Sequence, residues 1–429
     1  MKSDKKTMKT SSDYNTATLT NGLRVVHLPS DAQVVYCGFA IAVGSRHEAP
    51  GQEGLAHFCE HVSFKGTQTR TAMQILNHLE RVGGDLNAFT NKEDTVFYAA
   101  VLRQHVQRAV ELLADLVFRS TYPQQEIDHE VEVICDEIES YNDSPAELIF
   151  DEIENYCFKG HPLGHNILGT AERVRSFRTA DAITFTQRYY QPTNAVFFAS
   201  GNLHFDRLLR LLEKVTPAHS VNVSLPETCS LSKSSSASFV SPVAHSLPSP
   251  IIIEKGTHQA HVMLGTVAFP HTHPLRLPLY LLNNLLGGPG MNARLNIALR
   301  ERHGLVYTVE STMVGYSDLG LWCTYFGCDA ADVDKCLHLV RRELRRLVLS
   351  PLSERQLTAA ARQLKGQIGV SADNRENFAL DMARIFLHRD ELKDIDRLCA
   401  DIDALTPSLV QQAATEVFDE SRLQTLIYR

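Results

Sequence analysis

The sequence contains no long apolar run and no C-x-x-C pair of cysteines. No stretch of about 18 consecutive apolar residues occurs, so the chain predicts no membrane span. Its nine cysteines lie far apart, which indicates a reducing compartment rather than a disulfide framework. Residues 1–12 are polar and basic with no apolar segment behind them, which argues against a secretory signal. Together these absences predict a cytoplasmic protein.

The chain also lacks an excess of positive charge. A net charge of −8 gives no reason to expect nucleic acid or an anionic membrane as a partner. Hydrophobic residues at 44% and charged residues at 21% are ordinary for a globular protein. The length of 429 residues suits two domains of about 200 residues each.

What the sequence does contain is a helical stretch, residues 54–64, with two histidines four residues apart. Side chains at i and i+4 share one side of a helix, so His57 and His61 can hold a metal ion between their ring nitrogens. Glu60 shares that side and can reach a water on the metal. The order H-x-x-E-H is the inverted form of the zinc-peptidase motif. The alternative is a core helix whose histidines are satisfied by neighbouring residues.

Hydrophobic periodicity divides the rest of the chain into strands and helices. Strand patterns occupy 23–27, 34–43, 86–101 (two strands around a turn at 91–94) and 193–201. Helical patterns occupy 71–82, 104–118, 125–141, 146–156 and 180–190.

The second half repeats this order, which predicts two copies of one unit. Strands at 251–255 and 261–265 precede a helix at 275–286, a strand pair within 305–328 and a helix at 331–347. The expected division is an N-terminal domain at 14–226, a Ser/Pro-rich linker at 227–250 and a C-terminal domain at 251–429.

Glu137, in the helical stretch 125–141, is the candidate third metal ligand. It borders an apolar stripe, and metal ligation would relieve the cost of a carboxylate placed there. Two histidines, a carboxylate and a water form a catalytic zinc set. Glu130, two turns earlier, could hydrogen-bond a ligand histidine. The alternative for both glutamates is a solvated position at the edge of the stripe.

The C-terminal copy lacks this constellation. A shift of 228 residues lays Thr358 on Glu130 and Lys365 on Glu137. A lysine in place of a ligand carboxylate is incompatible with a second zinc site of the same kind.

The motif residues 57–61, the segment 64–67 and the two downstream glutamates resemble the pitrilysin/insulinase family of zinc peptidases, processing-peptidase branch. Segments 43–48, 86–98, 287–295 and 300–307 are also similar to family segments. The resemblance implies an α+β fold of two homologous domains, each an antiparallel-rich mixed sheet covered by helices. This metallohydrolase duplication forms half of a clamshell. A two-domain chain then implies a homodimer, or a heterodimer with a related chain.

The resemblance also implies roles at the metal centre. His57, His61 and Glu137 bind one zinc ion, and the 75 residues between His61 and Glu137 match the family spacing. Glu60 is the general base for a zinc-activated water, and Glu130 supports the site. Cys59 departs from the larger apolar residue usual in the family. It is most simply a packing residue, although a thiol beside two ligands could make activity sensitive to oxidation.

Two further segments are implied to bind the substrate. Arg300 and Tyr307 resemble a pair that stabilises the oxyanion or grips the substrate backbone, in the same chain or from a partner chain. Ordinary packing is the alternative for this pair. Asn87, Ala88 and Phe89 lie where family members present an edge strand to an extended peptide.

The resulting prediction is a zinc-dependent endopeptidase that cleaves peptides or unfolded protein segments. One alternative is a catalytically silent partner subunit of a heterodimeric peptidase, known in the family where motif residues are lost. The presence of His57, Glu60, His61 and Glu137 counts against it. Another alternative is a zinc hydrolase with a non-peptide substrate.

Overall fold

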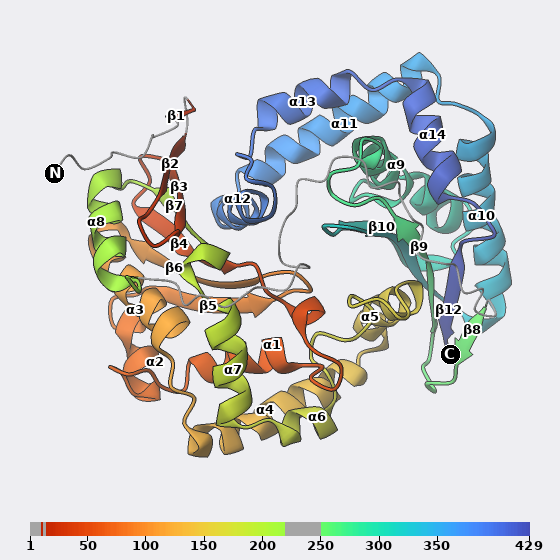
Figure 1. The fold of residues 1–429 in the computed structure, drawn as a ribbon. Coiled ribbons are helices and arrows are strands. Elements are labelled where there is room, and N and C mark those ends of the chain that lie inside the picture. Colours follow the sequence, from red (N-terminus) through yellow and green to blue (C-terminus); the bar gives the residue numbers. More distant parts are fainter. Residues whose placement is uncertain (1–9, 12–13, 219–249) are drawn as a thin grey trace. The chain divides into compact units, whose positions relative to one another are not determined.

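The computed structural model describes residues 10–11, 14–218 and 250–429, which belong to two compact units (Figure 1). Of the described residues, unit 1 comprises 10–11, 14–138, 165–218 and 372–393, and unit 2 comprises 139–164, 250–371 and 394–429. The linker predicted at 227–250 lies, apart from Pro250, outside the described residues. The domain boundaries drawn from the sequence stay a prediction.

Unit 1 is built on a seven-stranded sheet in the order β1-β2-β3-β7-β4-β6-β5. Its strands are β1 Thr10–Ser11, β2 Tyr14–Thr18, β3 Arg24–Pro29, β4 Val34–Ile41, β5 Asp85–Thr90, β6 Thr95–Leu102 and β7 Ala195–Gly201. Strands β3 and β7 pair in parallel, and the other described pairs of this sheet are antiparallel. Strand β5 forms one edge of the sheet.

Helices cover both faces of this sheet because its central strands are apolar on both sides. In β4, Val35, Cys37 and Phe39 contribute to one core and Tyr36 and Ala40 to the other, as the two-residue period of a strand requires. The first core is completed by α1 Leu55–Ser63, α2 Ala72–Glu80, α3 Val106–Arg119, α4 Gln124–Asn142, α6 Ala171–Ser176, α7 Thr179–Tyr189 and α8 Phe205–Val215. The second core is closed by α12, Arg375–Arg389, which packs on β4 and β7.

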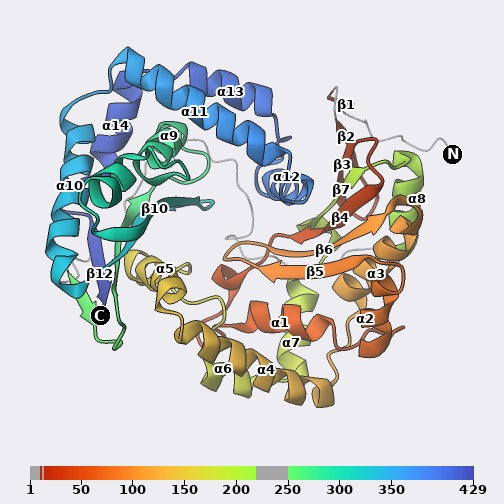
Figure 2. The ribbon, with the colours of Figure 1, turned by 180° about the vertical axis from the view of Figure 1, so that it is seen from behind.

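Unit 2 repeats the plan with a five-stranded sheet in the order β10-β11-β9-β12-β8 (Figure 2). The strands are β8 Ile251–Ile253, β9 Ala260–Ala268, β10 Val306–Gly315, β11 Gly320–Cys328 and β12 Gln424–Tyr428. One face is covered by α9 Arg276–Gly287, the π-helical η5 Asn296–Glu301, α10 Val333–Leu349, α11 Glu354–Ala372, α13 Ile395–Asp403 and α14 Pro407–Val417. The other face packs against α5, Pro145–Cys157.

The two halves of the chain therefore exchange one helix each. Helix α5 comes from the N-terminal half and covers the sheet of unit 2, whereas α12 comes from the C-terminal half and covers the sheet of unit 1. The expected fold class, two helix-covered mixed sheets rich in antiparallel pairs, is confirmed. Within the described residues, no helix is both long and apolar enough to cross a bilayer.

A buried ion-pair cluster fixes α12 to the turn between β5 and β6. Asp94 is 1% exposed and accepts hydrogen bonds from Arg384 Nε at 3.1 Å and His388 Nε2 at 2.9 Å. Burial alone raises the pKa of Asp94, but His388 and Arg384 outweigh it and lower the pKa to about 2. The cluster thus connects the strand pair β5–β6 to a helix far away in the sequence.

Asp94→Asn is expected to lower the thermal unfolding midpoint at pH 7 by several degrees. A pKa lowered in the folded state contributes stability that is present above the unfolded value of 3.8 and is lost as pH falls towards 2. The contribution is about 2 kcal/mol. The midpoint difference between wild type and Asp94→Asn, measured by calorimetry, should therefore shrink below pH 4. A difference equally large at pH 7 and pH 3 would contradict this account. Asp31→Asn, in an exposed turn, is the control.

Candidate metal centre

The start of α1, which carries the H-x-x-E-H motif, is fixed by Gly54 and Glu48. Gly54 has φ +97°, and a Cβ there would lie 2.7 Å from the carbonyl oxygen of Leu168. Such a backbone conformation and so close an approach both favour glycine. The buried Glu48 carboxylate accepts the N–H groups of Gly54 at 3.0 Å and Ala56 at 2.7 Å. These are N–H groups that the start of a helix leaves without intrahelical partners.

The orientation of α1 about its own axis is set by its apolar residues. Leu55, Phe58, Cys59 and Val62 are all buried in the core of unit 1. The opposite side of the helix presents His57, Glu60 and His61. The expectation that Cys59 packs in the core agrees with its complete burial.

Glu137, from α4, meets the two histidines of α1. Its carboxylate Oε2 lies 3.3 Å from His61 Nε2, and its Oε1 lies 3.8 Å from His57 Nε2. One ligand atom from each of the three residues lies within 4.8 Å of the other two. Among the described residues, this is the one group of three or more His, Cys, Asp or Glu side chains that meets this test.

These three residues fit a zinc ion by geometry and by chemistry. Imidazole nitrogen and carboxylate oxygen are zinc ligands, and bonds of 2.0–2.2 Å in a tetrahedron put ligand atoms about 3.3–3.6 Å apart. The His61–Glu137 pair already has this separation at 3.3 Å, and the His57–Glu137 pair, at 3.8 Å, is close to it. Three protein ligands leave a fourth position for water or substrate, which is the arrangement of catalytic rather than structural sites.

Glu130 orients the ring of His61, one of the candidate ligands. Its Oε1 accepts a hydrogen bond from His61 Nδ1 at 3.0 Å, which directs Nε2 of that ring towards Glu137. The other oxygen of Glu130 pairs with Lys65. Glu130 is only 7% exposed, and this salt bridge compensates the cost of burying its negative charge.

The local potential favours a cation between the two helices. Burial alone lowers the pKa of His61, but hydrogen bonds to Glu130 and Glu137 outweigh it and raise the pKa to about 9. Burial and the neighbouring His61 lower the pKa of His57 to about 4, so this ring is neutral at pH 7 and ready to act as a ligand. The hydrogen bond from His61 lowers the pKa of Glu137. A metal ion would take the place that the extra proton on His61 occupies.

Glu60 lies beside this cluster and is held by Thr90. The Thr90 hydroxyl donates a hydrogen bond to Glu60 Oε2 at 2.7 Å, and both residues are buried. Burial raises the pKa of Glu60, and the hydrogen bond from Thr90 opposes that rise. Thr90 is the last residue of β5, so the edge strand and the motif helix meet at this bond.

The structure places the other candidate residues as follows. Asn87, Ala88 and Phe89 lie in β5, at the edge of the unit 1 sheet. Arg300 lies in η5 and Tyr307 in β10, both in unit 2, and the Arg300 guanidinium lies 5.6 Å from the centre of the Tyr307 ring. Tyr307 is 81% exposed. Their roles towards a substrate stay predictions.

The burial expected for Glu137 from the sequence was wrong. Glu137 was expected at a buried position where an unpaired carboxylate would be costly, yet its side chain is 45% exposed. The alternative, a solvated position at the edge of the stripe, agrees with this exposure, although the two carboxylate oxygens face His57 and His61. For Glu130 the solvated alternative fails, because this residue is the buried one.

Sequence reasoning missed three residues that hold the site in place. Lys65 follows the motif closely, but a single lysine carries no pattern that would single it out. Thr90 ends the first of the two strands predicted within 86–101, and nothing in its spacing points to Glu60. His165 bonds through Nε2 to the Glu48 carboxylate at 2.9 Å and so supports the start of α1.

Such a fold and site define a metallopeptidase of the inverted-motif class, and comparisons with known proteins give the family. Residues 24–171 match the family model of insulinase (peptidase family M16), and residues 176–364 match that of the peptidase M16 inactive domain. The chain belongs to this pitrilysin/insulinase family and to its processing-peptidase-like branch.

Relatives and solved structures agree with this assignment. An uncharacterized zinc protease of Bacillus subtilis is 31% identical over 96% of this chain and 97% of its own length. The beta subunit of the bovine mitochondrial-processing peptidase is 30% identical over 94% of this chain and 82% of its own. A protease from Helicobacter pylori, 21% identical, superposes with a TM-score of 0.84 over 97% and 99% of the two chains and shows the same fold.

Proposed function

We propose that this chain is a zinc-dependent endopeptidase that cleaves peptides or unfolded protein segments. The observation that carries the proposal is the convergence of His57, His61 and Glu137, with the carboxylate of Glu60 alongside. A zinc ion bound by these three residues supplies Lewis-acid chemistry, polarising a carbonyl and making water reactive near neutral pH. The names of the relatives, zinc protease and processing peptidase, support the same reading.

Within this proposal each side chain has a separate task. Glu60 takes a proton from the attacking water at its carboxylate and passes it to the leaving amine. Thr90 keeps that carboxylate in place through its hydroxyl. Glu130 fixes the ring orientation of His61. Glu60 therefore moves the proton, whereas Thr90 and Glu130 act by holding Glu60 and His61 in position.

Substrate binding is assigned to the edge strand and to the pair in unit 2. The backbone of Asn87, Ala88 and Phe89 at an edge offers hydrogen-bonding groups to an extended peptide, with little regard to its side chains. Such pairing favours peptides over non-peptide substrates. We assign Arg300 and Tyr307 to binding the substrate backbone or stabilising the oxyanion, either in the same chain or from a partner.

Assembly and location complete the proposal. The mitochondrial relative is named as a subunit, and we propose that this chain likewise pairs, with a copy of itself or with a related chain. Light scattering after size-exclusion chromatography on the purified chain distinguishes the two, since only self-pairing gives a dimer mass. A cytoplasmic location agrees with the dispersed cysteines, and the eight cysteines among the described residues are free.

The direct test measures zinc content and hydrolysis on the same preparation. We expect one zinc ion per chain by plasma mass spectrometry and cleavage of quenched fluorescent peptides and of an unfolded protein. Chelation should abolish cleavage, and added zinc should restore it. A zinc-loaded protein that cleaves no member of a broad peptide library would overturn the proposal. It would then fit the silent-subunit alternative or, if esters were hydrolysed, the non-peptide one.

Replacing Thr90 by valine is expected to lower kcat about tenfold, because a hydrogen bond to a charged group is removed without a change of shape. KM and zinc content should stay at wild-type values, since neither the edge-strand backbone nor the ligands change. Thr90→Ser keeps the hydroxyl and is the matched control. Steady-state kinetics on one fluorescent peptide measure all three proteins. Equal losses in the serine and valine variants would show that Thr90 acts through packing alone.

A further inference from the structure

The chain crosses the start of the motif helix α1 where it re-enters unit 1, along the segment 165–169. Gly169 has φ +68°, and a Cβ there would lie 2.3 Å from the carbonyl oxygen of Glu53. Gly54 faces the same crossing, and its Cβ would lie 2.7 Å from the carbonyl oxygen of Leu168. The two backbones therefore pack directly on each other, an approach that glycine permits and a side chain would prevent.

The ring of His165, at the beginning of this segment, completes the hydrogen bonding of Glu48. The Glu48 side chain is fully buried, and its Oε2 accepts hydrogen bonds from His165 Nε2 at 2.9 Å and from the N–H of Gly54 at 3.0 Å. Its Oε1 accepts the N–H of Ala56. Burial raises the pKa of Glu48, and the hydrogen bonds from His165 and from the backbone oppose that rise. A buried carboxylate needs such donors, so loss of the His165 ring would leave the charge of Glu48 less well compensated at the N-terminus of α1.

The carbonyl group of His165 is bonded to a different element. It accepts a hydrogen bond from Lys92 Nζ, and Lys92 is only 2% exposed. Lys92 lies in the turn between β5 and β6, two residues after Thr90, which is the last residue of β5. His165 thus bonds to the start of α1 through its ring and to the end of β5 through its backbone.

The two elements that His165 connects are those that meet at Glu60. Thr90 donates its hydroxyl to Glu60 Oε2 at 2.7 Å, and this bond requires that β5 and α1 keep their relative position. Helix α1 is only nine residues long and carries Glu60 within two turns of the N-terminus that Glu48 holds. A displacement of that N-terminus would therefore move both His57 and Glu60.

We propose that His165 is a positioning residue of the metal centre. Its ring holds α1 through Glu48, its carbonyl group holds β5 through Lys92, and together these bonds keep the Thr90 hydroxyl on Glu60. His165 acts through these neighbours and not on the reacting atoms. The kinetic consequences of this inference rest on the proposed peptidase function, whereas its consequences for the metal centre can be measured without a substrate.

The first test compares His165→Leu with His165→Gln. Leucine has no donor for the Glu48 carboxylate, whereas the amide of glutamine keeps a donor near the place of Nε2. We expect His165→Leu to bind zinc about tenfold more weakly, measured by competition with a chromogenic chelator, and His165→Gln to stay within about threefold of wild type. The visible absorption of cobalt-substituted protein depends on coordination geometry, so the cobalt bands should shift in His165→Leu and not in His165→Gln.

A double-variant cycle tests the connection to Thr90. Thr90→Val is expected to lower kcat about tenfold in the wild-type background. In the His165→Leu background the hydrogen bond from Thr90 to Glu60 is already weakened, so the same replacement should lower kcat less than about threefold at saturating zinc. A loss of about tenfold in both backgrounds would overturn the proposal.

Lys92→Met tests the second bond by itself, and it decides the question if His165→Leu does not fold. The change removes the donor to the His165 carbonyl group and leaves Glu48 and its hydrogen bonds in place. We expect kcat to fall severalfold and the loss caused by Thr90→Val to shrink in this background too, while zinc affinity stays at the wild-type value. A Lys92→Met protein with wild-type sensitivity to Thr90→Val would contradict the proposal.

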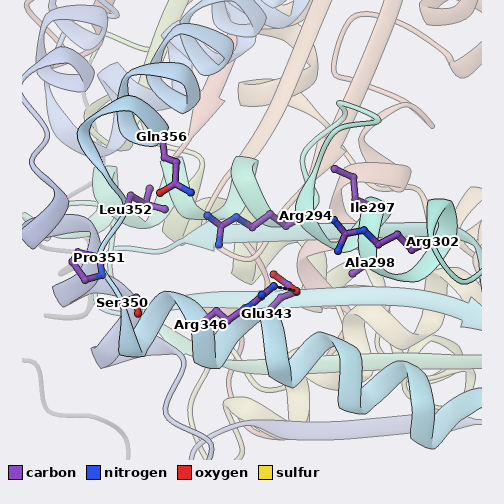
Figure 3. A pocket seen from close by; sticks show the side chains of 10 residues that line it. All are labelled: Arg294, Ile297, Ala298, Arg302, Glu343, Arg346, Ser350, Pro351, Leu352 and Gln356. Atoms are coloured by element: carbon purple, nitrogen blue, oxygen red, sulfur yellow. Dashed lines mark hydrogen bonds and ion pairs between the residues drawn. The ribbon is translucent and has the colours of Figure 1, made fainter.

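A matched control removes a donor from a buried carboxylate in unit 2. There Arg346 Nη1 donates to Glu343 Oε1 at 2.9 Å, beside the cavity shown in Figure 3, and Glu343 is 5% exposed. Arg346→Gln should leave zinc affinity and the cobalt bands unchanged. His161→Gln should do the same, because His161 lies four residues before His165 but pairs with Asp318 of unit 2 at 3.3 Å.

The outcomes separate this proposal from the proposed function. Wild-type protein that binds zinc and cleaves no peptide would refute the peptidase, and zinc affinity and the cobalt bands would still test His165. Wild-type zinc affinity, cobalt bands and kcat in His165→Leu would refute the positioning role. Losses of the same size in the leucine and glutamine variants would also refute it, because they would not depend on the donor to Glu48.

Discussion

Glu60→Gln is expected to lower peptide cleavage at least about a hundredfold while zinc content stays at the wild-type level. The amide cannot accept the proton that Glu60 is proposed to take, yet it keeps the shape of the side chain. It can also still accept the hydrogen bond that Thr90 donates to Glu60 Oε2 at 2.7 Å. Initial rates on a quenched fluorescent peptide, normalised to bound zinc, measure the effect.

A matched variant separates this loss from a general effect of removing a carboxylate. Glu80→Gln, at the exposed end of α2, makes the same chemical change away from the motif and should be fully active. Cleavage by Glu60→Gln at the wild-type rate would remove Glu60 as the general base. A loss of zinc together with activity would show instead that Glu60 supports the metal centre.

Glu137→Gln is expected to weaken zinc binding at least about a hundredfold and to abolish cleavage at limiting zinc. Outer residues that orient a ligand typically contribute 10–100-fold in metal affinity, and a ligand contributes at least as much. The carboxylate of Glu137 faces both histidines at 3.3 Å and 3.8 Å, so a neutral amide at this position removes the negative charge that faces the two rings. Competition with a chromogenic chelator measures the affinity.

Two further variants on α4 give a graded series. Glu130 contacts Nδ1 of His61, the nitrogen turned away from Glu137, and also pairs with Lys65. Glu130→Gln should therefore lose about 10–100-fold in zinc affinity. Asp136→Asn, the exposed neighbour of Glu137, should bind zinc normally. Equal affinities in Glu137→Gln and Asp136→Asn would show that Glu137 is not a ligand.

Most of the helices and strands could be predicted from the sequence because their apolar residues recur at regular intervals. Val35, Cys37 and Phe39 alternate towards one core, and Leu55, Phe58, Cys59 and Val62 fix one side of α1. The same spacing puts His57 and His61 side by side. The exchange of α5 and α12 was not predictable, because an apolar helix face shows that a partner exists and not which sheet it is.

Glu137, the candidate third ligand, shows a different limit of prediction from sequence. The reasoning from burial failed at Glu137, which is exposed, and only the family spacing singled it out. Thr90 could not be found at all, because its contact with Glu60 joins residues 30 positions apart on different elements. Such contacts depend on how β5 passes α1, which no local pattern encodes.

The helix exchange has a consequence for how the protein is synthesised. One apolar face of the seven-stranded sheet in unit 1 is covered by α12, through Ala379, Met382 and Ala383. This helix lies near the end of the chain. During translation the ribosome releases that sheet long before those residues emerge. Until α12 has been synthesised, the apolar side chains of Val26, Ala40 and Phe198 are not covered by it. The nascent N-terminal half of the chain is therefore a candidate client for chaperones.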